Sequence, residues 1–192
     1  MSKIIAIMLL LCCGMMLFGC ADDNGRRKAE QQKTIVVTDS VGRKVELPYP
    51  LERVAVCNVY NAELITAVGA IDKIVGVDNY IFKDQSGFKN RFNEAQVFGI
   101  SQNAMNYEKL AELAPQAVII TGEGTWRDAQ EMLDRFGIKV IVINSYYTDQ
   151  FADNCRLIGR IFGREEQAEE LVNYFNDKLA YIQKQLQGVP RR

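Results

Sequence analysis

Hydrophobic positions along this chain alternate between two patterns. Short runs rich in Val and Ile are apolar on both faces, which predicts strands buried on both sides of a parallel sheet. These runs cover 53–57, 73–77, 117–121 and 139–143. Segments with helical spacing separate the runs and predict helices that end at glycine or before proline. These segments cover 61–68, 107–113, 126–136 and 151–162. The alternation indicates an α/β fold with helices on both faces of the sheet.

Two further elements flank this core. Residues 34–39 and 43–47 alternate as strands do around Ser40-Val41-Gly42, which predicts an N-terminal β-hairpin. Residues 164–187 form a long helical pattern with one apolar face. At about 1.5 Å per residue this helix is roughly 35 Å long, the width of a domain.

The N-terminal residues predict export. Lys3 precedes an unbroken apolar run at 4–18, shorter than the ~18 residues that cross a bilayer, so 1–19 is typical of a secretory signal peptide. Its end, Leu17-Phe18-Gly19-Cys20, resembles a bacterial lipobox, in which Cys20 carries lipid. A buried cysteine of an N-terminal helix is the alternative. Residues 20–33 are polar and predict a flexible tether. We therefore expect an extracytoplasmic protein, anchored by lipid to the cell membrane, in the periplasm or on the outer face.

Composition removes several functional classes. Lys and Arg number 23 against 24 Asp and Glu, so no nucleic acid is expected as a partner. Histidine is absent, which excludes Ser-His-Asp and Cys-His triads and His-ligated zinc. Of the cysteines in the expected domain, Cys57 and Cys155 form either one disulfide or two buried thiols. A flavodoxin-like enzyme that holds phosphate at Gly122-Glu123-Gly124-Thr125 is a remote alternative, because a fuller glycine signature is missing.

Candidate binding residues follow the strands, because ligands of open parallel sheets lie outside the carboxyl ends of the strands. They are Asn58, Tyr60, Asn61, Asn79, Tyr80, Gln102, Asn103, Glu123, Trp126, Arg127, Tyr146 and Tyr147. Tyrosine and tryptophan offer broad, stiff faces for a large planar or hydrophobic ligand, and Arg127 offers forked donors for an anion. Helix capping and turns are the alternative roles of the asparagines, and core packing is the alternative role of the aromatic residues. No metal site and no catalytic residue is predicted.

Together these segments resemble the solute-binding proteins of ABC importers that carry ferric siderophores, haem or cobalamin. The resemblance covers about 34–187 and rests on the order of three motifs behind the lipobox. They are Asn61-Ala62-Glu63-Leu64, the return from Gly69 to Val75-Gly76-Val77, and Asn106-Tyr107-Glu108 followed by Leu113-Ala114-Pro115. The resemblance implies two Rossmann-like α/β lobes, joined by a helix, that hold the ligand between them. Residues 34–163 then form the first lobe and 164–187 the connecting helix, while 188–192 begin a second lobe that this truncated chain lacks.

The function implied by this resemblance is binding without catalysis. The chain is expected to bind a ferric siderophore and deliver it to an ABC permease and its ATPase, with Glu108 meeting arginines of the permease. No cofactor is expected. Haem is an alternative ligand, with Tyr60, Tyr80 or Tyr146 as axial ligand. Cobalamin is another: Tyr80 stands where the cobalamin binders carry a cleft tyrosine, although Gln102 replaces their tryptophan. Besides ligand binding and the flavodoxin-like enzyme, a third class of function is a surface scaffold that binds no small ligand.

Overall fold

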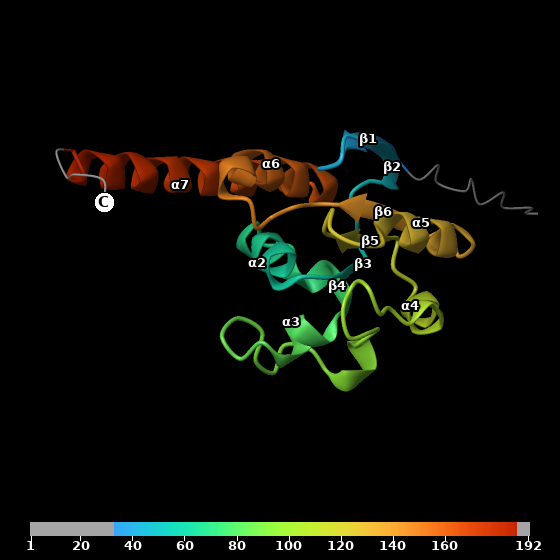
Figure 1. Cartoon of the computed structure of the whole chain (residues 1–192). Coiled ribbons are helices and arrows are strands. Elements are labelled where there is room, and N and C mark those ends of the chain that lie inside the picture. Colours follow the sequence, from blue (N-terminus) through green and yellow to red (C-terminus); the bar gives the residue numbers. More distant parts are fainter. Residues whose placement is uncertain (1–32, 188–192) are drawn as a thin grey trace, which may run out of the picture. The chain divides into compact units, whose positions relative to one another are not determined.

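The computed structural model describes residues 33–187 (Figure 1). The expected signal peptide, the lipidated Cys20 and residues 188–192 lie outside the described residues. The same holds for the expected tether, apart from Lys33. None of the described helices is both long enough and apolar enough to cross a membrane.

A four-stranded parallel sheet forms the centre of the fold, as the apolar runs predict. Its strands are β3 (Val54–Val56), β4 (Ile74–Val77), β5 (Ala117–Ile120) and β6 (Lys139–Val142). Their spatial order is β4-β3-β5-β6. The carboxyl ends of the four strands therefore share one edge of the sheet, which is the edge expected to hold a ligand.

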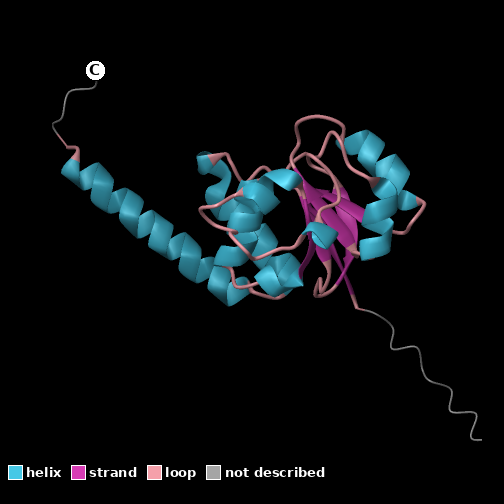
Figure 2. Cartoon of the chain, turned by 90° about the horizontal axis from the view of Figure 1, so that it is seen from below, coloured by secondary structure: helices cyan, strands magenta, loops and turns pink. Residues whose placement is uncertain are grey.

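Helices cover both faces of this sheet (Figure 2). They are α2 (Val59–Ala67), α3 (Asn79–Lys83), α4 (Tyr107–Leu113), α5 (Trp126–Asp134), α6 (Phe151–Phe162) and α7 (Glu165–Gln185). Three short 3-10 turns complete the fold: η1 (Ile71–Lys73), η2 (Glu94–Gln96) and η3 (Thr148–Gln150). The predicted helix that was to run over 126–136 ends at Asp134, and the one predicted over 61–68 begins two residues early, at Val59.

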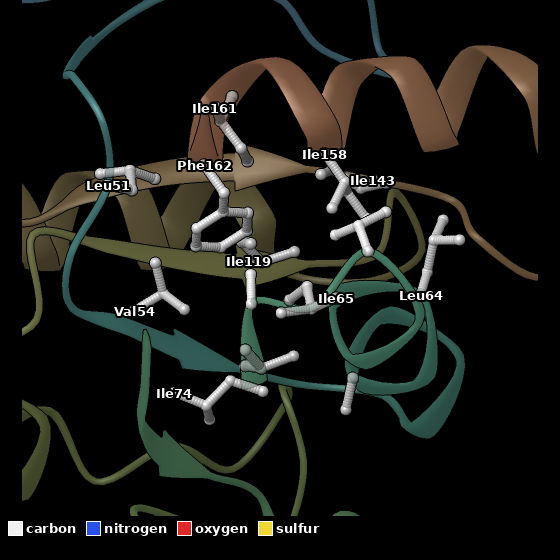
Figure 3. Close-up of a cluster of buried hydrophobic side chains, with 14 of the residues drawn as sticks. Leu51, Val54, Leu64, Ile65, Ile74, Ile119, Ile143, Ile158, Ile161 and Phe162 are labelled. Atoms are coloured by element: carbon white, nitrogen blue, oxygen red, sulfur yellow. The ribbon is translucent and has the colours of Figure 1, made fainter. Parts of the chain in front are cut away.

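Alternation along the strands divides the interior into two hydrophobic cores. In β5, Ile119 faces the core that includes residues of α2, α6 and α7, whereas Val118 and Ile120 face the core beneath α4 and α5. Successive side chains of a strand point to opposite faces, so β3, β5 and β6 each contribute to both cores. Figure 3 shows the first core, where Ile65, Ile119 and Ile158 lie between the sheet and two helices.

The two cysteines lie on opposite sides of the sheet. Cys57 belongs to the core beneath α4 and α5, and Cys155 belongs to the other core. Both are buried and free, so the alternative of two separate thiols holds. Burial raises the pKa of Cys57 well above its ordinary value and that of Cys155 to about 12, which leaves both thiols protonated at neutral pH.

The N-terminal hairpin holds the outer edge of the sheet in place. Strands β1 (Thr34–Thr38) and β2 (Lys44–Pro48) pair antiparallel. From the turn between them, Ser40 donates its backbone N–H to Val142 O at 2.9 Å, and the buried Asp39 carboxylate accepts from Val142 N at 3.3 Å. Arg43 pairs with Asp39 at 2.6 Å and donates to Val140 O. These contacts cover the edge of β6, which would otherwise expose unpaired backbone groups.

The last helix, α7, has a packed half and an exposed half. Its N-terminal half lies against α6, where the rings of Phe151 and Phe175 stack with centroids 4.2 Å apart. Gly159 allows this approach, because a Cβ there would collide with Ala168. Further along α7, Ile182 is 50% exposed, and Leu186, which caps the end of the helix, is 56% exposed. The apolar face predicted for 164–187 is thus covered in its first half and exposed in its second half (Figure 1).

Candidate functional site

A pocket of about 600 Å³ opens at the carboxyl ends of β3, β4 and β5. We call it the strand-tip pocket. Six of its lining residues are among those expected from the sequence: Asn58, Tyr60, Tyr80, Gln102, Asn103 and Glu123. Six more also line it: Val59, Glu63, Asp78, Ser101, Thr121 and Gly124. Sheet topology brings these residues together from four separate parts of the chain, within 58–63, 78–80, 101–103 and 121–124.

Asn58 positions the first tyrosine of the pocket. It follows β3 with φ +77°, a conformation that is uncommon for residues with a side chain. Its side-chain oxygen caps α2 by accepting from the backbone N–H of Tyr60 at 2.9 Å. Tyr60 therefore lies in the first turn of α2, beside the pocket, and is 55% exposed. The sequence had suggested Asn61 as this cap, but the helix begins earlier.

Asp78 joins the tips of β3 and β4. One carboxylate oxygen accepts from Asn58 N at 3.0 Å, and the other caps α3 by accepting from Ile81 N at 3.0 Å. Burial raises the pKa of Asp78 from its ordinary value, while these backbone N–H donors act in the opposite direction. Two residues later Tyr80 is presented from the first turn of α3, 63% exposed. Asp78 thus fixes the loop that carries the second tyrosine.

Gln102 attaches the loop before α4 to the tip of β5. Its side-chain oxygen accepts from the backbone N–H of Thr121 at 3.0 Å and from the Thr121 hydroxyl at 2.8 Å. Its amide nitrogen donates to the backbone oxygen of Glu123. Gly124, with φ +87°, lies so close to Asn103 that a Cβ would collide with it. The polar groups of Gln102 are therefore mostly used to build the pocket wall.

At the tip of β6, Tyr146 contacts the pocket wall without lining the pocket. Its hydroxyl donates to Glu123 Oε1 at 3.0 Å, and its ring lies 4.4 Å from that of Tyr147. Burial, followed by hydrogen bonding to Tyr147 and Glu123, raises the pKa of Tyr146. Both tyrosines of this pair are among the residues expected to bind the ligand, and neither lines the strand-tip pocket.

Four other predicted residues also lie outside the pocket lining. Asn61 is buried and donates to Cys57 O at 3.2 Å, inside the helix rather than at its start. Asn79 lines a separate surface hollow beside Lys83. Trp126 is partly buried against the second core, with the guanidinium groups of Arg43 and Arg127 each 4.2 Å from its ring. The aromatic ring of Trp126 is therefore already in contact with two cations of the protein itself.

Two acidic lining residues were absent from the predicted set. Glu63 lies three residues after Tyr60, so both occupy one face of α2 and both reach the pocket. That helical spacing was the available signal. Asp78 directly follows a strand, which was also a signal, although its burial and its capping role required the tertiary structure. Within the described residues no group of three or more acidic or cysteine side chains is placed to hold a metal ion.

Glu108 stands apart from the pocket lining. It lies in the first turn of α4, whose cap is Asn106, and its side chain is exposed. The Asn106 side chain accepts from Lys109 N at 2.9 Å, as expected for the start of this helix. A carboxylate in a first turn is also favoured by the helix dipole, so this position alone does not identify a partner.

Comparison with known proteins agrees with this architecture. The family described as "Periplasmic binding protein" matches residues 54–192. A periplasmic solute binding protein from Veillonella parvula superposes with a TM-score of 0.69 at 28% identity, over 83% of this chain and 50% of that one. SirA of Staphylococcus aureus complexed with staphyloferrin B superposes with a TM-score of 0.64 at 21% identity, over 79% of this chain and 50% of SirA. Molybdate-bound MolA of Haemophilus influenzae superposes with a TM-score of 0.70 at 21% identity, over 81% of this chain and 55% of MolA.

These solved structures are about twice as long as the part that the chain matches, so the chain spans about half of their length. No curated protein sequence matches it. The family match covers most of the chain, including every strand of the parallel sheet, and the solved structures share its fold. The chain therefore belongs to the periplasmic binding protein family.

Proposed function

We propose that this chain is the ligand-binding lipoprotein of an ABC importer and that its ligand is a ferric siderophore. In this role it binds the chelate outside the cytoplasm and passes it to the permease, which the ATPase drives. Lipid on Cys20 would keep it at the membrane. It makes and breaks no covalent bond of the ligand.

The observation that carries this proposal is the strand-tip pocket with its two exposed tyrosines. Tyr60 and Tyr80 come from different strand tips, and both line the same hollow of about 600 Å³. That volume suits a small molecule rather than a bare ion. Tyrosine faces and amide groups suit the mixed apolar and polar surface of an iron chelate. Among the solved structures with this fold, SirA is complexed with staphyloferrin B.

The half-length match supports a two-lobed arrangement as part of the same proposal. The described chain provides one α/β lobe, and α7 continues beyond α6 with an exposed apolar face. We propose that α7 is the connecting helix and that a second lobe closes over the strand-tip pocket. The lobe alone then makes only part of the contacts, so it should bind more weakly than a two-lobed protein, by about a hundredfold.

Binding can be tested by titrating the purified chain with ferric siderophores while following its intrinsic fluorescence. Tyr60→Ala and Tyr80→Ala should each weaken binding about tenfold, because each removes an aromatic face from the pocket. Tyr181→Ala is the matched control, since Tyr181 is 63% exposed on α7, as Tyr80 is on α3. Equal losses in all three variants would contradict the assignment of the pocket.

The same titration with haem distinguishes the alternative ligand. If haem binds and Tyr60→Phe or Tyr80→Phe changes the haem absorption spectrum, a tyrosine hydroxyl is its axial ligand and haem replaces the siderophore. If neither ferric chelates nor haem bind, the proposal of an iron-importing protein is wrong.

Glu108 is our proposed contact with the permease. An exposed carboxylate that meets permease arginines would contribute to orientation and rate of encounter more than to affinity. Glu108→Arg should leave chelate binding by the purified chain unchanged and reduce chelate uptake by intact cells. Glu131→Arg, a like exchange at an exposed position on α5, is the control. Weaker binding by the purified Glu108→Arg variant would place Glu108 in the ligand site instead.

A further inference from the structure

The lining of the strand-tip pocket is acidic. Glu63, Asp78 and Glu123 contribute carboxylates to it, and no lysine or arginine of the described residues lines it. Within residues 33–187, none of these three carboxylates takes part in a salt bridge. Their negative charge is therefore not neutralised by a basic side chain of the described chain.

The carboxylates differ in how they are held. Asp78 is buried and accepts two backbone N–H groups. Glu123 is exposed and fixed by the hydroxyl of Tyr146 at 3.0 Å, which directs one carboxylate oxygen. Glu63 is exposed on the same helix face as Tyr60. Two carboxylates are therefore accessible at the mouth, and the third lies beneath them.

Basic side chains near the strand tips are directed elsewhere. Arg43 is paired with Asp39 at 2.6 Å and lies over one face of Trp126. Arg127 lies over the Trp126 ring as well, at 4.2 Å, and does not line the pocket. The sequence had suggested Arg127 as the partner of a ligand anion. In the structure, its guanidinium is associated with an aromatic ring outside the pocket.

The neutral part of the lining points to the same ligand charge. The faces of tyrosine rings carry negative electrostatic potential and attract cations within about 6 Å. Tyr60 and Tyr80 line the pocket with more than half of each side chain exposed. Both the carboxylates and the exposed aromatic rings therefore favour positive charge on the bound molecule.

We infer that the strand-tip pocket selects iron chelates with a net positive charge over chelates with a net negative charge. This inference rests on the proposed function, and it adds the charge class of the substrate. An anionic chelate would meet uncompensated carboxylates, whereas a pendant ammonium group of a cationic chelate can pair with Glu63 or Glu123. For exposed groups in water we expect a preference of about tenfold at low ionic strength.

A matched set of probes isolates the charge. One linear trihydroxamate with a terminal amine forms a ferric complex with a net positive charge. Acetylating that amine gives a neutral complex, and succinylating it gives an anionic one, while the iron centre stays the same. The purified chain is titrated with each of the three ferric complexes by fluorescence quenching, at low and at high salt. We expect affinity to fall in the order cationic, neutral, anionic, and the differences to shrink as salt screens the carboxylates.

Charge-neutral variants identify the responsible residues. Glu63→Gln and Glu123→Gln keep the shape of the side chain, and together they should reduce the tenfold cation preference to about twofold or less. Glu131→Gln is the control, because it removes one exposed carboxylate on α5, outside the pocket lining. It should leave the preference unchanged. Circular dichroism of each variant verifies that the fold is retained.

Each outcome has one meaning. If the three complexes bind equally, or the anionic one binds best, the charge inference is overturned while the proposed function stands. If the preference survives in the double Glu→Gln variant, the carboxylates are not its source and the inference is likewise overturned. If none of these three hydroxamate complexes binds, but a ferric chelate of another type with a net negative charge does, the charge inference is overturned while the proposed function stands. If no ferric chelate of any charge binds, the proposed function fails with it.

Discussion

The tips of β3 and β4 can be compared with the tips of β5 and β6, because both carry aromatic residues at the same edge of the sheet. Beside β3 and β4, Tyr60 and Tyr80 are more than half exposed and line the pocket. Beside β5 and β6, the ring of Trp126 contacts the guanidinium groups of Arg43 and Arg127, and Tyr146 donates to Glu123. Similar residues thus face the pocket or support its wall, depending on whether the protein already supplies their partners.

This difference follows from what surrounds each tip. On the β6 side, the hairpin contributes Asp39 and Arg43, which hold the edge strand and occupy one face of Trp126. On the β4 side, the caps of α2 and α3 use short asparagine and aspartate side chains, which leave the following tyrosines uncovered. One side of the pocket is therefore a supported wall and the other a contact surface.

Asp39 gives the strongest test of the supported side. Asp39→Ala removes a buried carboxylate and leaves Arg43 without its partner, so we expect the free energy of unfolding to fall by about 3 kcal/mol. Urea denaturation measures this, with Asp149→Ala at an exposed position as the control. A loss no larger than that of the control would mean that the hairpin does not hold β6.

A Trp126 variant tests whether this residue supports the pocket wall without contacting the ligand. Trp126→Ala should lower the free energy of unfolding by about 2 kcal/mol, because the ring packs against the core and two guanidinium groups. Chelate affinity should change less than about twofold, in contrast to Tyr80→Ala. Since Trp126 is the single tryptophan, affinity is followed here by ultrafiltration and iron absorbance. A tenfold loss of affinity would mean that Trp126 contacts the ligand and that the two sides of the pocket do not differ in this way.

Gln102 lies between the two sides and should have an intermediate effect. Gln102→Ala leaves the backbone N–H and hydroxyl of Thr121 without their acceptor, which should cost about 1 kcal/mol of unfolding free energy. Hydrogen exchange of the amide at Thr121 should accelerate, whereas that of Ile119 in the middle of β5 should not. Gln85→Ala, at an exposed loop position, is the control.

Tyr146 should give the smallest effect and a distinct pH dependence. Its pKa is raised above the ordinary value of 10.0, so the folded state favours the neutral phenol. The resulting stability is fully present below pH 10 and is lost as the pH rises through the folded-state pKa. Tyr146→Phe should cost under about 1 kcal/mol at pH 7 and should make stability less sensitive to alkali. Identical unfolding curves for both proteins between pH 9 and about 11 would contradict this.

Much of the fold could be predicted, because strand and helix signals are local. The runs of Val and Ile predicted all four strands of the sheet within a residue or two. Gly163 adopts φ +64° and ends α6 where the sequence placed that end. The start of α2 was predicted two residues too late, because Asn58 and Asn61 can each cap a helix and only the three-dimensional structure distinguishes them.

Half of the predicted site residues line the pocket, and the others do not, for a consistent reason. The rule that ligands lie at strand tips identifies the edge of the sheet at which the pocket opens, but not the direction of each side chain. Direction depends on partners far along the chain. Tyr146 contacts Glu123 at a separation of 23 residues, and Gln102 contacts Thr121 at a separation of 19.

The sequence by itself therefore determined the parallel sheet, its helical layers, the hairpin and the edge of the sheet at which the pocket opens, since periodicity and turn residues act over a few neighbours. Only the tertiary structure decided which side chains remain available at that edge. Arg127 lies over Trp126, and Glu63 and Asp78 line the pocket. The charge of the site arises from these packing arrangements, because contacts across the fold determine which charged groups reach the pocket and which are held elsewhere.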